Sequence, residues 1–340
     1  MVQTPPPDGR FAKWILLLTI LLALAARLAA GQENSAQPPS ERLYDKLKGA
    51  SVEVLVDGHL DGSGWFVDPK GLLFTAGHVI GRPGRKIEIL SPVAGRREAK
   101  VVAIDLGHDL ALLSVEPREG GYPALALAEK LPAPGDDIFA LGAPIFRHAV
   151  LFRGMVARSD TTFEYYTEKY VEVVQVAATI PDGMSGGPWV NRAGEVVGLQ
   201  SAVMSLKSVP VGLAYMSPPA AIRELLKNRR TAATAALGAA VEEPWQQARD
   251  LLDRFPPQTE GLVVRALQKD GPAARAGLKE NDLVVAAEGK KVRLTDELLR
   301  IVRGKQPGQS LELSVLGPDG TGQRKVTVRL GKLEAGWPEP

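Results

Sequence analysis

The amino-acid sequence predicts a mainly β protein in which two β-barrel halves are followed by a small α+β domain. Short segments of alternating apolar and polar residues recur through most of the chain, and Gly, Pro and Asp turns separate them. Many short strands at close spacing are typical of barrels and sandwiches, whereas a doubly wound sheet would alternate strands with helices. The length of 340 residues also exceeds one ordinary core and suggests about two domains.

Strand-like segments and turns define the first half of the β region. The turns include Asp57-Gly58, Asp61-Gly62 and Pro83-Gly84. The predicted strands are 51–56, 64–67, 72–74, 86–90, 101–104 and 110–115. A turn-rich stretch, 116–135, follows them.

The second half repeats this pattern and ends in a helix. Its predicted strands are 137–141, 151–159, 171–176, 188–191, 195–203 and 211–216. A helix is expected over 219–227, where Pro219 stands at the start and Ile222, Leu225 and Leu226 share one face. We assign both halves to one domain over residues 46–230.

A weakly patterned linker, 228–236, separates this domain from a C-terminal domain over residues 236–333. Its predicted strands are 261–266, 283–287, 311–316 and 325–330, with helices over 272–276 and 295–303. The mixture of strands and helices predicts a small α+β domain.

The composition excludes several classes of function. Lys and Arg total 41 against 39 Asp and Glu, and the two signs are interspersed, so no basic face predicts nucleic-acid binding. The absence of cysteine excludes disulfides, cysteine-ligated zinc and thiol nucleophiles. No H-E-x-x-H motif is present, and we expect neither a metal site nor a cofactor.

The N-terminus has the pattern of an export segment. Arg10 and Lys13 precede the apolar run Trp14–Ala26, and small residues follow it. With Leu28–Ala30 added, the run approaches the ~20 residues of a spanning helix. Residues 1–31 are therefore predicted to be a signal peptide or a membrane anchor, and the polar residues 32–45 a linker. We expect an exported protein, in the periplasm or on the outer face of the cytoplasmic membrane.

A G-x-S-x-G motif centres on Ser185, and the order of residues along the chain separates the two hydrolase classes that share this motif. In α/β-hydrolases the histidine follows the serine. All four histidines of this chain precede Ser185, which excludes that order. The remaining order, His then Asp then Ser, is that of chymotrypsin-like enzymes, whose serine is followed by a strand.

His78 and Asp109 complete the predicted triad. His78 lies in Thr75-Ala76-Gly77-His78-Val79 after an apolar strand, and Asp109 directly precedes the strand 110–115. In this role His78 would accept the Ser185 proton, and Asp109 would fix the imidazole tautomer. Gly183 would allow its own N–H and that of Ser185 to converge on the oxyanion.

These motifs resemble the HtrA family of serine proteases, the DegP/DegQ-like enzymes, from about Lys46 to Leu330. The matching segments are GSGWFVDPKGLLFTAGHVI, GHDLALLSV, VVQVAATIPDGMSGGPWVNRAGEVVGLQSAV and VGLAYMSPPAAIRELL. The resemblance implies a chymotrypsin-like double β-barrel followed by one PDZ domain. It also implies unfolded or misfolded proteins as substrates and a homotrimer as the expected assembly.

The C-terminal segment EGLVVRALQKDGPAARAGLKENDLVVAAEGKKV resembles a PDZ domain. The resemblance implies that Leu237, Gly238 and Ala239 form the loop that binds the carboxylate of peptide C-termini. Two positions depart from the family pattern. Met184 stands where family members usually have Asn, and Ala239 is smaller than the usual apolar residue.

The resemblance to chymotrypsin-like enzymes also predicts a primary substrate pocket. Thr179, six residues before the serine, would lie at its base, and Gln200, Ser201 and Ala202 would form a wall. Because the base residue is not acidic, we expect no preference for Lys or Arg. The family analogy favours small aliphatic residues before the cut.

Three hypotheses on function follow from the sequence. The first is an endopeptidase that acts on unfolded exported proteins. The second is a non-proteolytic chaperone or scaffold that binds peptides, and the third a regulatory protease with one narrow target. The complete triad favours proteolysis, and retention of residues 14–30 on the mature protein would favour the third hypothesis.

Overall fold

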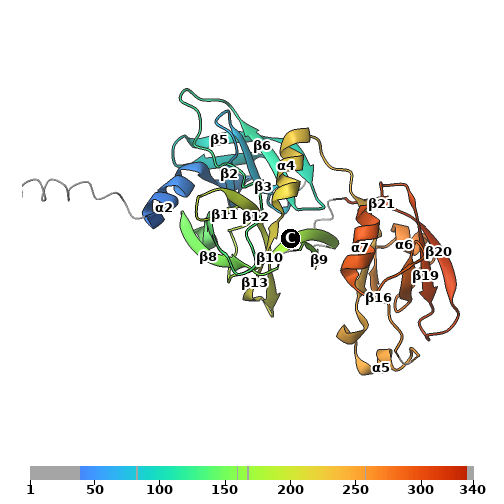
Figure 1. Ribbon diagram of the computed structural model, residues 1–340. Helices are drawn as coiled ribbons and strands as arrows, with labels where there is room; N and C mark the ends of the chain where they lie inside the picture. Colours follow the sequence, from blue (N-terminus) through green and yellow to red (C-terminus); the bar gives the residue numbers. More distant parts are fainter. Residues whose placement is uncertain (1–38, 82, 159, 167, 257, 335–340) are drawn as a thin grey trace, which may run out of the picture. The chain divides into compact units, whose positions relative to one another are not determined.

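The computed structural model describes residues 39–81, 83–158, 160–166, 168–256 and 258–334 (Figure 1). The predicted export segment, residues 1–31, lies outside these ranges. None of the helices within them combines the length and the apolar composition that a bilayer crossing needs.

The described chain begins with helix α2, Pro39–Ala50. We predicted a linker up to residue 45, and the structure differs because the helix starts at Pro39. Proline is tolerated in a first helical turn, and the apolar side chains Leu43, Leu47 and Ala50 are spaced to share one face. Leu47 and Ala50 are buried, which ties the end of this helix to the domain that follows.

The first barrel is closed, with strand order β1-β2-β3-β6-β5-β4, which confirms the predicted barrel. Its strands carry large, fully buried side chains, among them Trp65, Phe66 and Phe74, and Trp65 stacks on Phe74. The strands are β1 (Ser51–Val56), β2 (His59–Phe66), β3 (Leu72–Ala76), β4 (Ile87–Ser91), β5 (Gly95–Asp105) and β6 (Leu110–Val115).

The second barrel is built on a 7-stranded sheet, ordered β13-β12-β11-β7-β8-β10-β9, and pairing of β10 with β13 closes it. Trp189 is fully buried in its core. The strands are β7 (Asp137–Gly142), β8 (Val150–Val156), β9 (Thr162–Tyr166), β10 (Lys169–Ala177), β11 (Pro188–Val190), β12 (Val196–Leu206) and β13 (Val209–Ser217), with the 3-10 turn η1 (Pro144–Phe146) between β7 and β8.

Strand β9 was missed by the sequence analysis. It forms a hairpin with β10, in which Tyr166 is paired with Lys169 and Thr162 with Val173. Two helices complete this domain. The short helix α3 (Gly77–Ile80) directly follows β3 and contains His78, and α4 (Pro219–Asn228) confirms the predicted helix.

The C-terminal domain has a sheet ordered β15-β16-β17-β19-β20, and β15 lies at its edge. Leu262, Val284, Leu298 and Leu313 are part of its core. Its elements are β14 (Ala235–Ala236), β15 (Ala239–Glu242), η2 (Pro244–Gln246), α5 (Arg249–Leu252), β16 (Leu262–Leu267), α6 (Pro272–Arg275), β17 (Leu283–Ala287), β18 (Lys290–Lys291), α7 (Thr295–Arg303), β19 (Ser310–Leu316), β20 (Arg324–Arg329) and β21 (Gly331–Lys332).

The turn between β5 and β6 is held by His108, which lies between two carboxylates. Its Nδ1 is 2.7 Å from Asp105 Oδ2, and its Nε2 is 3.4 Å from Glu172 Oε2 on β10. Burial alone would lower the pKa of His108, but the two carboxylates outweigh burial and raise it to about 9. The hydrogen bond from His108 in turn lowers the pKa of Glu172 to about 2. This ion-pair cluster joins the first barrel to the second. It lies beside the predicted catalytic acid in the chain, because His108 directly precedes Asp109.

We expect the stability supplied by His108 to disappear at alkaline pH. Its pKa is higher in the folded chain than in the unfolded chain, so the contribution is complete below pH ~6.5 and is lost as pH rises through about 9. One pKa unit corresponds to about 1.4 kcal/mol, so His108→Gln should destabilise the protein by up to about 3 kcal/mol at pH 6 and by much less at pH 10. Urea unfolding at both pH values measures the difference, with the exposed His59→Gln as control. A destabilisation that is equal at both pH values would contradict this assignment.

Candidate active site

His78 and Asp109 lie together, as predicted. The carboxylate of Asp109 accepts the backbone N–H of His78 at 2.9 Å through Oδ1 and contacts His78 Nδ1 at 2.7 Å through Oδ2. A carboxylate can only accept, so Nδ1 carries the hydrogen and Nε2 is the basic nitrogen. The Asp109 side chain is 1% exposed and that of His78 27%, so the acid is enclosed while the base reaches solvent.

Electrostatics couples these two side chains. Burial disfavours a charge on His78, but the carboxylate of Asp109 outweighs burial and raises the pKa of His78 above its ordinary value. Burial likewise opposes the charge on Asp109, yet His78 and the hydroxyl of Ser201 keep the pKa of Asp109 low. The site therefore contains a buried carboxylate that favours an imidazolium beside it.

Ser185 lies in a tight turn that both barrels hold. Its carbonyl oxygen accepts the N–H of Ser63, on β2 of the first barrel, at 2.8 Å. Its hydroxyl donates to the carbonyl oxygen of Ser201, on β12, at 3.2 Å. The hydroxyl of Ser201 in turn donates to Asp109 Oδ2. Ser201 therefore connects the predicted nucleophile with the predicted acid.

The peptide groups around Gly183 have fixed orientations. The carbonyl of Asp182 accepts the N–H of Ile145, and the carbonyl of Met184 accepts the N–H of Gly187, each at 2.9 Å. Because C=O and N–H point in opposite directions across a trans peptide, the N–H of Gly183 points away from Ile145, and that of Ser185 away from Gly187.

Gly183 is required at its position. Its φ is +92°, and a Cβ there would lie 2.4 Å from the carbonyl oxygen of Ala143. Met184, the departure from the family pattern, is fully buried in the core of the second barrel, in the same cluster as Ile138 and Trp189. An apolar side chain therefore anchors the turn where relatives usually have a polar one.

The predicted substrate pocket stays a prediction, and the structure shows that the side chain of one of its residues, Gln200, is buried. Gln200 is 1% exposed, and its amide oxygen accepts the indole N–H of Trp189 at 2.9 Å. Its side chain is therefore used inside the barrel, which leaves its backbone for the predicted pocket wall. Thr179 is exposed, and its hydroxyl would lie 3.8 Å from a Cβ at Gly212, which the sequence analysis did not single out.

The predicted carboxylate-binding loop joins β14 to β15. The carbonyl of Leu237 accepts the N–H of Ala273 at 3.1 Å, and that of Gly238 accepts the N–H of Gln268 at 3.0 Å. By the same geometry of trans peptides, the N–H groups of Gly238 and Ala239 point away from those partners. Ala239 begins the edge strand β15.

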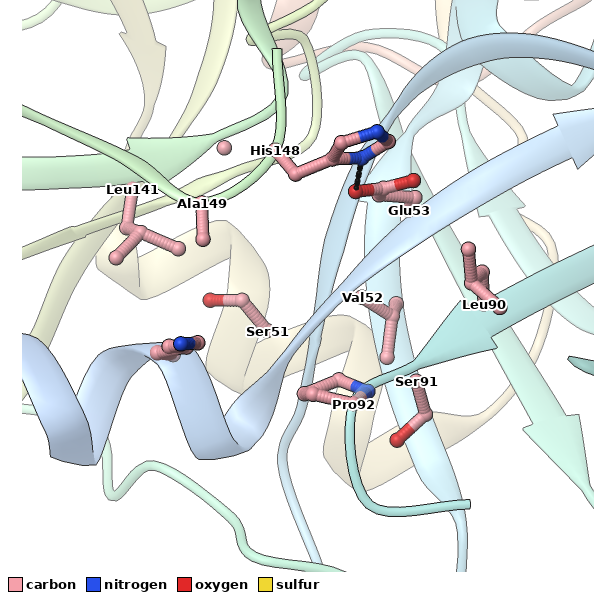
Figure 2. Close-up of a pocket in the computed structure, with 11 residues that line it drawn as sticks. Ser51, Val52, Glu53, Leu90, Ser91, Pro92, Leu141, His148 and Ala149 are labelled. Carbon is pink, nitrogen blue, oxygen red and sulfur yellow. Dashed lines mark hydrogen bonds and ion pairs between the residues drawn. The ribbon is translucent and has the colours of Figure 1, made fainter. Parts of the chain in front are cut away.

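A separate hollow of about 410 Å³ lies between α2, β1, β4 and the β7–β8 loop (Figure 2). Figure 2 shows Leu141 and Ala149 beside it and the imidazole of His148, whose Nδ1 is 2.5 Å from Glu53 Oε1. None of the predicted site residues is among those that line it. We therefore do not assign the chemistry to this hollow.

Sequence reasoning missed three side chains around the site. Ser63 Oγ donates to the carbonyl of Gly183 at 2.9 Å and accepts the N–H of Ala143 at 3.0 Å. Ser201 was predicted only as a pocket wall, and Tyr166 lies on the unpredicted strand β9, where its hydroxyl is 2.6 Å from Ser201 Oγ. The alternating aromatic residues of Thr162–Tyr166 are the sequence signal that could have revealed this strand.

Comparison with protein families gives two matches. Residues 62–199 match the trypsin-like peptidase domain, and residues 249–329 match the PDZ domain. Relatives named probable periplasmic serine endoprotease DegP-like include one from Ectopseudomonas mendocina, 30% identical over 80% of this chain and 56% of its own length. One from Halomonas elongata is 30% identical over 82% of this chain and 57% of its own length. The chain thus spans about half the length of the curated relatives it matches.

Solved structures agree on the fold. The HtrA-type protease AlgW with tripeptide has a TM-score of 0.62 at 22% identity, covering 87% of this chain and 98% of the other. A serine endoprotease from Yersinia pestis has a TM-score of 0.58 at 23% identity, covering 86% and 98%. The chain therefore carries a trypsin-like peptidase domain followed by a PDZ domain and is a relative of the HtrA-type, DegP-like serine proteases.

Proposed function

We propose that the chain is a serine endopeptidase with His78, Asp109 and Ser185 as its catalytic triad. The pairing of His78 Nδ1 with the buried Asp109 carboxylate is the observation that carries the proposal. This pairing gives the imidazole the tautomer that a general base needs. A non-proteolytic scaffold would not require a buried carboxylate in this arrangement.

In the proposed reaction the Ser185 hydroxyl turns from the Ser201 carbonyl toward the substrate and transfers its proton to His78 Nε2. The oxygen attacks the scissile carbonyl, and Asp109 stabilises the imidazolium that forms. His78 then protonates the leaving amine, which departs and leaves an acyl-enzyme. Water, deprotonated by His78, hydrolyses this ester and restores Ser185.

The N–H groups of Gly183 and Ser185 are the proposed oxyanion hole. The hydrogen bonds that fix the Asp182 and Met184 carbonyls support this role, because they hold the adjoining N–H groups in one orientation. Thr179, Gln200, Ser201 and Ala202 remain the proposed pocket residues, Gln200 through its backbone, now with Gly212. The resemblance to the family supports small aliphatic side chains before the cut.

The C-terminal domain is proposed to bind peptide C-termini. The N–H groups of Leu237, Gly238 and Ala239 would hold the carboxylate. The peptide would add to the edge strand β15, where it would have to displace the Tyr170 hydroxyl, which is hydrogen-bonded to the N–H and the carbonyl of Val241 at 2.8 Å each. Export to the periplasm is supported by the relatives, which are named periplasmic serine endoproteases. We further propose unfolded or misfolded proteins as substrates. We also propose that residues 1–31 anchor the protein on the outer face of the cytoplasmic membrane. The proposed assembly is a homotrimer.

Replacement of the nucleophile tests this function. The protein should cleave an unfolded, casein-like protein, and Ser185→Ala should lower the rate at least about 10⁴-fold, because the acyl-enzyme cannot form. Activity should fall on acidification through a pH above 6.5, since the pKa of His78 is raised and only neutral His78 accepts the proton. Product analysis by mass spectrometry checks both results. Equal cleavage by the variant and the wild type would remove Ser185 from the mechanism.

Gly183→Ala should abolish most catalysis with little loss of binding. The added Cβ would meet the Ala143 carbonyl and turn the oxyanion donor away, so kcat should fall about 10²- to 10³-fold with KM nearly unchanged. Gly84→Ala is the matched control, because Gly84 has a similar φ of +90° but open space around it. If both variants lose kcat equally, backbone strain rather than the oxyanion hole explains the effect.

The pocket assignment predicts a change of specificity. Thr179→Asp should place a carboxylate at the base and favour Lys or Arg before the cut, whereas Thr179→Asn, which has the same shape without charge, should not. Peptide libraries read by mass spectrometry measure the preference. An unchanged cleavage pattern in the Asp variant would exclude Thr179 from the pocket.

A further inference from the structure

The β9–β10 hairpin reaches the catalytic acid through side chains that the proposed mechanism does not use. Tyr166 ends β9 and is paired with Lys169, the first residue of β10. The Tyr166 ring packs in a small cluster with Tyr215 and Ala202. The Tyr166 hydroxyl is 2.6 Å from Ser201 Oγ. This hairpin therefore contacts the same serine that connects Ser185 with Asp109.

The direction of these hydrogen bonds follows from the number of available protons. The Ser201 hydroxyl has one hydrogen and donates it to Asp109 Oδ2. It must therefore accept from Tyr166, so the chain runs from Tyr166 through Ser201 to Asp109. Burial raises the pKa of Tyr166 well above its ordinary value, which keeps the phenol protonated as a donor. The same Oδ2 accepts a hydrogen bond from His78 Nδ1. His78 and Ser201 therefore hold this carboxylate oxygen directly, and Tyr166 holds it through Ser201.

Lys169 is a buried cation of the same hairpin, paired with Tyr166. It is 4% exposed, and lysine is almost never buried to this extent without a compensating charge. Asp109 is the carboxylate that favours its charged form, against burial, which lowers the pKa of Lys169. The lysine charge opposes protonation of His78. Within the described chain, Asp109 and Lys169 are the charged groups that shift the pKa of His78. The pKa of Tyr166 is raised by burial and by the titratable groups of Asp109, Glu164 and Tyr215.

We propose that Tyr166 and Lys169 are positioning residues of the catalytic acid and base. Tyr166 orients the Ser201 hydroxyl toward Asp109, and Lys169, paired with Tyr166 in the same hairpin, supplies a buried positive charge that favours the ionised carboxylate. The inference rests on the proposed function, because it assigns support for the same triad. It adds that the β9–β10 hairpin of the second barrel supports the catalytic acid and base.

Full-length variants with a matched control test the hydrogen-bond chain. Tyr166→Phe should lower kcat about fivefold with KM unchanged, the effect of losing one neutral hydrogen bond. Tyr165→Phe changes the adjacent tyrosine, whose side chain is exposed, and should leave both constants as in the wild type. Equal constants for the two variants would overturn the role of Tyr166.

The charge of Lys169 is tested by pH dependence. Lys169→Met removes the cation, so the acid limb of kcat/KM should move to higher pH by about one unit, and Lys169→Arg should restore it. An unmoved limb in Lys169→Met would overturn the role of Lys169. If Lys169→Met does not fold, Lys169→Gln takes its place.

An NMR titration separates this inference from the proposed function. In a Ser185→Ala background, the His78 ring signals report its pKa without any turnover. A higher His78 pKa in Lys169→Met supports the inference even if the wild-type protein cleaves nothing. An unchanged His78 pKa, beside an active wild type, overturns the inference and leaves the protease assignment intact.

Discussion

The carboxylate of Asp109 is the group on which the arrangement of the site depends. A buried, ionised carboxylate is costly unless hydrogen bonds and opposite charge compensate it. Asp109 meets this condition with donors from three places: the backbone and imidazole of His78 and the hydroxyl of Ser201. Two of the donors come from α3 and the third from β12, so satisfying one carboxylate brings α3, β12 and the β5–β6 turn together.

The serine turn depends on a second set of constraints. Ser63, on the first barrel, holds the carbonyls of Ser185 and Gly183, and the β7–β8 loop holds the carbonyl of Asp182. These hydrogen bonds fix peptide planes rather than side chains, which is what an oxyanion hole requires. The buried Met184 anchors this turn in the core of the second barrel.

The sequence was sufficient to predict the parts of the fold that local patterns determine. Alternation of apolar residues located the barrel strands, and the helix 295–303 agrees with α7 at both ends. The His-Asp-Ser order identified residues that the structure brings together. Strand β9 was missed because its alternating pattern is short, and the hydrogen bond between Gln200 and Trp189 could not be predicted because it depends on tertiary packing. Ser63, Tyr166 and Lys169 reach the site only through strand pairing between distant segments, which no local pattern contains.

A fluorophosphonate probe tests the central claim most directly, namely that His78 and Asp109 activate Ser185. The Ser185 oxygen would displace fluoride at phosphorus and form a stable ester, with the hydroxyl proton taken by His78. The structure predicts one adduct, located by mass spectrometry on the peptide that contains Ser185 and nearly absent in His78→Ala. Labelling at another residue, or equal labelling of wild type and His78→Ala, would contradict the assignment of this triad.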